Sequence, residues 1–198
     1  HLWEFDETAG AASSSTVLKD LVGGAHGTVR GAGALSTGTG VKLPGGDQNS
    51  AAYIDLPNGL ISPLKQVTFE GWVAINATGG NFSHILSFGS SEPGGANGEV
   101  FGPGNTNGGG WYGLDYISLT ACVGTDYNSQ RFAVRNAEPN GGGEPYSDSA
   151  GPTTLGQLVH IVLTADSSAA GSTTLRYYRD GLLRSQLDNV PFNLSDLN

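Results

Sequence analysis

Three carboxylates near the start of the chain, Glu4, Asp6 and Glu7, are the first residues whose spacing could support chemistry. Two carboxylates held ~5–5.5 Å apart can hydrolyse a glycosidic bond with retention of configuration. In an extended strand, Glu4 and Asp6 would share one face and Glu7 would point to the other. Because this spacing gathers only two of the three groups, we expect a solvated face of an edge strand and assign no catalytic residues.

A glycine-rich stretch in the middle of the chain carries the second candidate site. The sequence Gly-Gly-Gly-Trp-Tyr-Gly at residues 108–113 places two aromatic rings on a pliable loop, where their burial is not assured. Sugar rings stack on such side chains and bond to nearby amide and carboxyl groups. The predicted ligand-binding residues are Trp111, Tyr112, Asp115, Asn105 and Asn107. The alternative is that Trp111 or Tyr112 caps the core beneath a long loop.

The other reactive or large side chains are expected to be structural. His84 and His160 each begin an apolar segment, which favours a partly buried, hydrogen-bonded imidazole. Cys122 lies between alanine and valine and is predicted to be a small core residue. Trp3 and Trp72 fall in alternating segments and are expected in the core. The sequence holds no H-E-x-x-H motif and no pair of cysteines, so it predicts no zinc site.

Composition and charge exclude several classes of partner. The 198 residues include 9 Lys and Arg against 18 Asp and Glu, which gives a net charge of −9 without any basic cluster, so nucleic acid is excluded. No apolar run approaches the ~18 residues of a membrane span. One cysteine allows no intrachain disulfide. The low lysine content, the abundant small polar residues and the start at His1 are typical of a mature exported chain, so a secreted or cell-surface location is expected.

Short alternating segments separated by turn residues predict strands throughout, and no segment has a convincing helical period. The expected strands are residues 2–6, 52–56, 67–75, 84–88, 116–123, 131–135 and 160–164, then a hairpin of 175–179 and 182–184. The hairpin turn is Asp180-Gly181, because both residues tolerate positive φ. Strands without intervening helices predict an all-β fold of antiparallel sheets, as one domain over residues 1–198.

Six blocks of sequence follow one another in a familiar order: Trp3–Gly10, Asp20–Val29, Tyr53–Pro57, Val67–Ile75, Val159–Thr164 and Tyr178–Leu183. Together they resemble the laminin-G-like domains of the concanavalin A-like lectin/glucanase superfamily. The resemblance implies a jelly-roll sandwich of two antiparallel sheets. It also implies a final strand similar to D-E-x-R-I-Y beside the first strand, and the chain stops at Asn198 before such a segment. We therefore expect an open edge beside residues 2–6, to be filled by a missing C-terminal strand or by a partner chain.

The same resemblance implies candidates for a metal ion and for catalysis. Asp20 and Asp47 lie beside paired glycines, in blocks similar to loops that hold one structural calcium ion in this superfamily. Calcium takes six to eight oxygen ligands, and glycine-rich loops let carbonyls converge on it. The alternative is that both are ordinary turn aspartates. Glycosidases of the superfamily carry a motif similar to E-x-D-x-x-E, but Ala9 occupies the position of its third carboxylate here.

Three functions remain open from the sequence, because the fold alone does not choose among them. The first is an extracellular, non-catalytic binding or adhesion module directed at carbohydrate, with a glycan or another cell-surface ligand as partner. The second is a glycan hydrolase or lyase, which needs two carboxylates, or a His, Tyr and Arg set, in one groove. The third is a structural subunit completed by a strand donated from another chain.

Overall fold

The computed structural model describes residues 1–46, 51–76, 83–89, 115–123, 129–136, 145–148, 150–152 and 154–197, and the structural statements below concern these residues. They form β-strands and a single turn of 3₁₀ helix, which confirms the all-β fold. The chain divides into two compact units, one of residues 1–58 and the other of the described residues from 59 onward. Each unit is described by itself, and a single domain over residues 1–198 stays a prediction.

The first unit contains two small antiparallel sheets with the orders β2-β3-β6 and β1-β4-β5. Their strands are β1 (Gly10–Ala11), β2 (Val17–Leu18), β3 (Gly27–Arg30), β4 (Leu35–Ser36), β5 (Val41–Lys42) and β6 (Tyr53–Asp55). The buried cluster of this unit is small and consists of Ala12, Leu18, Val29, Ala34 and Ala52. With so little apolar surface to bury, the unit depends on polar contacts for much of its order.

The strand predicted over residues 2–6 is wrong except for one isolated bridge between Trp3 and Asp20. Phe5 has a φ of 54°, in the left-handed region, and this interrupts the extended alternation that strands require. The backbone N–H of Leu2 donates instead to the Asp20 carboxylate at 2.9 Å. The shared strand face expected for Glu4 therefore does not form. The expectation that another strand fills an edge here stays a prediction.

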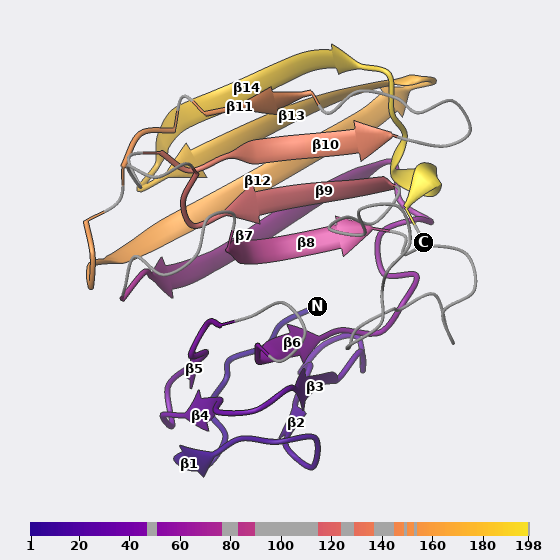
Figure 1. Cartoon of the computed structure of the whole chain (residues 1–198). Helices are drawn as coiled ribbons and strands as arrows, with labels where there is room; N and C mark the ends of the chain where they lie inside the picture. Colours follow the sequence, from indigo (N-terminus) through magenta and orange to yellow (C-terminus); the bar gives the residue numbers. More distant parts are fainter. Residues whose placement is uncertain are drawn as a thin grey trace. The chain divides into compact units, whose positions relative to one another are not determined.

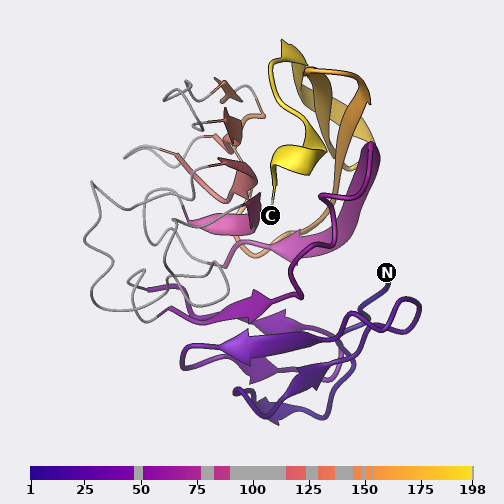
Figure 2. The same cartoon turned by 90° about the vertical axis from the view of Figure 1, so that its right-hand side faces the viewer.

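The second unit is a sandwich of two four-stranded antiparallel sheets with the orders β14-β13-β12-β7 and β11-β10-β9-β8. Figures 1 and 2 show the sheets as two layers, with the 3₁₀ turn η2 near one end. The first sheet contains β7 (Gln66–Ala74), β12 (Leu158–Ala169), β13 (Ser172–Arg179) and β14 (Leu182–Val190). The second contains β8 (His84–Gly89), β9 (Asp115–Thr120), β10 (Phe132–Asn136) and β11 (Tyr146–Ser147), and η2 is Leu194–Asp196.

The core of the sandwich comes from the inward side chains of both sheets. β9 and β10 contribute Ile117, Leu119, Phe132 and Val134, while β12 and β13 contribute Val159, Ile161, Leu163, Ala165, Leu175 and Tyr177. Phe69 and Phe88 stack across the two sheets with their ring centroids 4.5 Å apart. Leu194 and Leu197 join the same cluster from the C-terminal segment. The predicted strands from residue 67 onward are therefore confirmed, with β12, β13 and β14 longer and β9 shorter than expected.

The Asp180-Gly181 hairpin forms as predicted. Arg179 pairs directly with Leu182, which leaves a two-residue loop, and both loop residues have positive φ, at 52° and 76°. This combination matches the right-handed twist of the flanking strands. The turn also reaches the neighbouring strand, because Asp180 accepts a hydrogen bond from the His160 N–H at 2.9 Å and its own N–H donates to the His160 carbonyl at 2.8 Å.

A polar network lies inside the sandwich. Gln130 Oε1 accepts hydrogen bonds from the Tyr177 hydroxyl at 2.7 Å and from Arg179 Nη1 at 2.9 Å. Arg179 Nη2 donates to the Ala150 carbonyl at 3.0 Å, and Nη1 also reaches the Gly151 carbonyl at 3.3 Å. Within the described ranges this buried guanidinium has no carboxylate partner. Neutral oxygens alone therefore satisfy its N–H groups, and they tie the segment before β12 to β13.

Candidate ligand-binding face

The outward side of the sheet β14-β13-β12-β7 carries an exposed aromatic surface. Along β7, Val67, Phe69 and Val73 pack against the core, so the alternating residues Gln66, Thr68, Glu70 and Trp72 point outward. Trp72 is 65% exposed and lies near the end of β7, the edge strand of this sheet. The expectation that Trp72 belongs to the core is therefore wrong, because Trp72 shares the phase of the polar residues of β7.

The strand register assembles the groups around Trp72. Trp72 pairs with His160 of β12, Glu70 pairs with Val162, and Val162 in turn pairs with Tyr178 of β13. β12 and β13 alternate between buried and half-buried residues, which places these three partners on the outward side. We call the surface made by Trp72, Glu70, His160, Val162 and Tyr178 the Trp72 face. Its residues come from three neighbouring strands, β7, β12 and β13 (Figure 1).

His160 connects the aromatic and the polar groups of this face. Its ring lies beside the Trp72 indole, with the centroids 5.0 Å apart and the planes tilted by 41°. His160 Nε2 is 2.9 Å from Glu70 Oε1. Because a carboxylate can only accept, Nε2 carries the proton in this contact. The backbone bonds to Asp180 also fix the strand position of His160, so the imidazole is half-buried and hydrogen-bonded, as the sequence predicts.

Apolar side chains continue the Trp72 face towards the hairpin turn. Leu183 pairs with Tyr178 and is 50% exposed, and Leu158 near Trp72 is 59% exposed. Tyr178 is half-buried, and no described residue shares a hydrogen bond with its hydroxyl group. Exposed apolar side chains gathered on one sheet face can mark an interaction site.

The opposite end of the same sheet is polar and internally bonded. Arg176 Nε donates to Gln186 Oε1 at 3.0 Å, and Gln186 Nε2 donates to the Asp188 carboxylate at 2.8 and 2.9 Å. Gln66 Nε2 donates to Asp166 at 3.0 Å. Hydrogen bonds from the Ser168 hydroxyl and N–H, and then from Gln66, lower the pKa of Asp166. These polar groups are therefore paired with one another.

The ligand loop predicted from the sequence falls mostly outside the described part of the chain. Asn105, Asn107, Trp111 and Tyr112 lie outside the described residues, and Asp115 is placed only as the first residue of β9. Trp3, expected in the core, is half-buried and donates its indole N–H to the Ala25 carbonyl at 2.9 Å. Cys122 is buried as predicted, whereas His84 is exposed. The sequence signal for an outward Trp72 is the alternation of β7, in which Trp72 has the same phase as Thr68 and Glu70.

Asp20, the predicted calcium ligand, is buried at the centre of a hydrogen-bonded loop. Its carboxylate accepts bonds from the N–H groups of Leu2, Val22, Gly23 and Ala25, and His1 Nδ1 lies 2.6 Å from Oδ2. Burial acts to raise the pKa of Asp20, but the backbone hydrogen bonds outweigh it and hold the pKa well below its usual range. A cation at Asp20 would have to displace N–H donors.

Metal binding stays a prediction for both aspartates. Asp47 lies outside the described residues. In the parts of the chain that the structure describes, no three His, Cys, Asp or Glu side chains gather as a metal site would require. Of the three N-terminal carboxylates, Glu7 accepts a bond from the Lys19 N–H at 3.1 Å, which gives it a structural contact.

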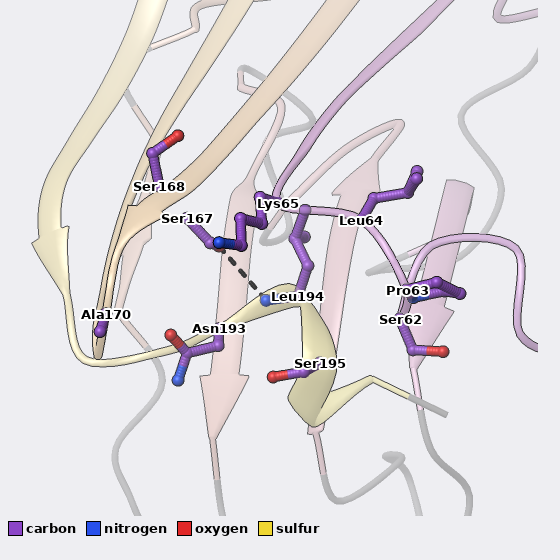
Figure 3. A pocket seen from close by; sticks show the side chains of 10 residues that line it. All are labelled: Ser62, Pro63, Leu64, Lys65, Ser167, Ser168, Ala170, Asn193, Leu194 and Ser195. Carbon is purple, nitrogen blue, oxygen red and sulfur yellow. Dashed lines mark hydrogen bonds between the residues drawn. The ribbon is translucent and has the colours of Figure 1, made fainter.

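A small pocket lies at the other end of the sandwich, where the C-terminal segment crosses β12 (Figure 3). It has a volume of about 270 Å³. Ser167 Oγ accepts the Leu194 N–H at 3.2 Å and lies 2.5 Å from Thr173 Oγ1, which itself donates to the Phe192 carbonyl. Because the Thr173 proton is already used, Ser167 donates to Thr173. These hydroxyl groups hold the segment after β14 in place.

Comparison with known families agrees with this architecture. Residues 47–196 match the family Laminin_G_3, described as the concanavalin A-like lectin/glucanases superfamily. The match covers most of the chain, so the protein belongs to this family, and the family fits a binding module. No curated protein matches the chain. Among the described residues, no helix has the length and apolar character needed to cross a membrane.

Proposed function

We propose that this protein is an extracellular, non-catalytic binding or adhesion module directed at carbohydrate, and that the Trp72 face binds the ligand. The proposal rests on the exposure of Trp72, because an indole left in water on the outward side of a regular edge strand forgoes the stabilisation of burial. A side chain held on a strand is also positioned more rigidly than one on a loop.

The chemistry of the Trp72 face suits a sugar. A pyranose ring has one face of C–H groups and a rim of hydroxyl groups. The Trp72 indole and Val162 offer apolar surface for the C–H groups, while the Glu70 carboxylate and His160 Nδ1 offer acceptors to the hydroxyl groups. Binding sites of this type combine an apolar floor with a few oriented polar groups.

Composition supports an extracellular location. A net charge of −9, few lysines and abundant glycine keep such a chain soluble without basic surfaces that attract nucleic acid. The single cysteine is buried, so no exposed thiol in the described residues is at risk of oxidation outside the cell.

A glycan array followed by titration calorimetry tests the function. The wild type should bind one group of neutral glycans, and Trp72→Ala should lower the affinity about tenfold or more because a stacked ring is lost. Tyr146→Ala is the control for loss of an exposed aromatic on the other sheet, with its stability measured alongside because the Arg131 guanidinium lies 3.8 Å from the Tyr146 ring centroid. Binding that survives Trp72→Ala, or that falls equally in the control, would contradict the site. An array without any bound glycan would contradict the function.

The predicted loop site is tested in the same assay. If Trp111 and its neighbours contact the ligand, Trp111→Ala lowers affinity and leaves stability nearly unchanged. A loss of about 3–5 kcal/mol in the free energy of unfolding would instead identify Trp111 as a core residue.

Chelation tests the calcium proposal for Asp20 and Asp47. A bound ion that is absent from the unfolded chain stabilises by mass action, by about 2.7 kcal/mol at a hundred times its Kd. EGTA should therefore lower the melting temperature, and added calcium should restore it. An unchanged melting temperature would remove the calcium proposal.

A further inference from the structure

The two aromatic rings of the Trp72 face have a fixed relation to each other. Trp72 pairs with His160, and Tyr178 pairs with Val162, two residues further along β12. The rings therefore stand two strands apart across the sheet and two residues apart along it. With a strand spacing of about 4.8 Å and a rise of about 3.4 Å per residue, their Cα atoms are roughly 12 Å apart.

A single sugar ring cannot contact both side chains at that separation. One pyranose ring with its linkage extends a glycan chain by about half of this separation, slightly more than one strand spacing of about 4.8 Å. A ligand that lies obliquely across β7, β12 and β13 therefore places one ring over each strand. The outer two rings would meet Trp72 and Tyr178, and the middle ring would lie over Val162, beside the Glu70–His160 pair.

The charges of the sheet bear on what kind of sugar fits. Glu70 lies within the Trp72 face, and Asp166 and Asp188 lie on the same sheet. The outward cation Arg176 keeps its charge, because its partner Gln186 is neutral, but it lies towards the polar end of the sheet, beside Asp166 and Asp188. With a net charge of −9 on the chain, an approaching carboxylate or sulfate meets repulsion.

We propose that the Trp72 face binds a linear, neutral oligosaccharide of at least three pyranose rings, with the first and third rings stacked on Trp72 and Tyr178. This inference rests on the carbohydrate-binding function proposed above and adds the length and charge of the ligand. It distinguishes binding along the inside of a glycan chain from binding of a terminal monosaccharide.

Calorimetry with chain-length series tests the inference. The probes are linear neutral glycans of one to six rings, beginning with β-1,3- and β-1,4-linked gluco-oligosaccharides, and oligogalacturonates as acidic counterparts. Affinity should rise steeply up to three rings and then level off. Tyr178→Val keeps a residue that favours strands and should lower the affinity for glycans of three or more rings about tenfold. The affinity for one or two rings should fall less, because such short glycans can bind at Trp72 alone.

The possible outcomes separate this inference from the proposed function. If glycans bind but affinity does not depend on length, or if Tyr178→Val weakens every length equally, the inference is overturned and the function stands. The same holds if the array returns only branched or acidic glycans. If no glycan binds the wild type, both fail. Far-UV circular dichroism of each variant shows whether it is folded.

Discussion

Tyr177 donates its hydroxyl hydrogen to Gln130 across the interior of the sandwich, over a distance of 2.7 Å. Gln130 lies just before β10 in one sheet and Tyr177 is in β13 of the other, so this bond joins the two layers. The same Gln130 oxygen serves Arg179. One amide oxygen therefore accepts hydrogen bonds from both the Tyr177 phenol and the buried Arg179 guanidinium.

The shared oxygen predicts unequal effects of two substitutions. Gln130→Leu should lower the free energy of unfolding by about 2–3 kcal/mol or more, because it leaves a buried donor and part of a cation unpaired. Tyr177→Phe removes only one neutral bond and should cost about 1 kcal/mol. Urea denaturation of both variants measures the difference. Equal losses would show that the Arg179 bond to Gln130 contributes nothing.

Tyr177 also predicts how stability falls in alkali. Burial raises its pKa to about 12, against a smaller opposing effect of the Arg179 charge. Because the folded pKa lies above the unfolded value of about 10, the stabilisation is complete below pH 10 and is lost as the pH rises towards 12. Two pKa units correspond to a loss of about 3 kcal/mol at most. Tyr177→Phe should flatten this alkaline limb in denaturation measured from pH 9 to 12, and an unchanged limb would contradict the assignment.

Asp20 predicts the corresponding behaviour in acid. Its pKa is lowered, so its contribution to stability is complete above the unfolded value near 4 and disappears as the pH falls below it. Asp20→Asn should destabilise the first unit at pH 7, because an amide nitrogen would face N–H donors, and should remove the acid dependence. Asp6→Asn, at an exposed position of the same unit, is the control. Unfolding curves measured at pH 7 and pH 3 give the loss of stability in acid for each protein. Equal losses in the wild type and in Asp20→Asn would show that the Asp20 carboxylate is not the source of the acid dependence.

Two glycines of the first unit differ in a way that predicts the cost of a methyl group. Gly31 and Gly38 both have positive φ, at 73° and 83°. A Cβ at Gly31 would lie 2.5 Å from the Ala51 carbonyl oxygen, whereas Gly38 faces open space. Gly38→Ala should therefore cost about 1–2 kcal/mol from backbone strain alone, and Gly31→Ala clearly more. Thermal unfolding of the pair measures the difference, and equal shifts would mean that the bridge between Ala32 and Ala51 is not formed.

Local signals predicted much of the second unit. The alternation of residues 67–75 and the Asp180-Gly181 turn specify strands and a hairpin by local chemistry, and both are present. Residues 2–6 alternate equally well but do not form a strand. The Asp20 carboxylate binds the Leu2 N–H, and Phe5 turns the backbone out of the extended region. A side chain 18 positions away made that difference, and local alternation does not reveal it.

The candidate site was less accessible to sequence reasoning than the fold. Trp72 could have been placed outward from the phase of its strand, since Thr68 and Glu70 share it. Its partners could not be named, because the pairing with His160 depends on a register between segments about 90 residues apart. The glycine-rich sequence around Trp111 predicts a ligand site because two aromatic residues among glycines are unusual in composition. The Trp72 face is instead built from ordinary strand residues.

The unbroken register of β7 and β12 has one further consequence. Nine consecutive residues of β7 pair with nine consecutive residues of β12 without a bulge. The pairs run from Gln66 with Asp166 at one end to Ala74 with Leu158 at the other. Such non-local pairing forms late and slowly in folding. A synthetic peptide of residues 66–74 would contain the indole and one carboxylate but no imidazole and no tyrosine. The Trp72 face is therefore a discontinuous epitope: antibodies selected for blocking it should recognise the native sheet and lose their target on a denaturing blot.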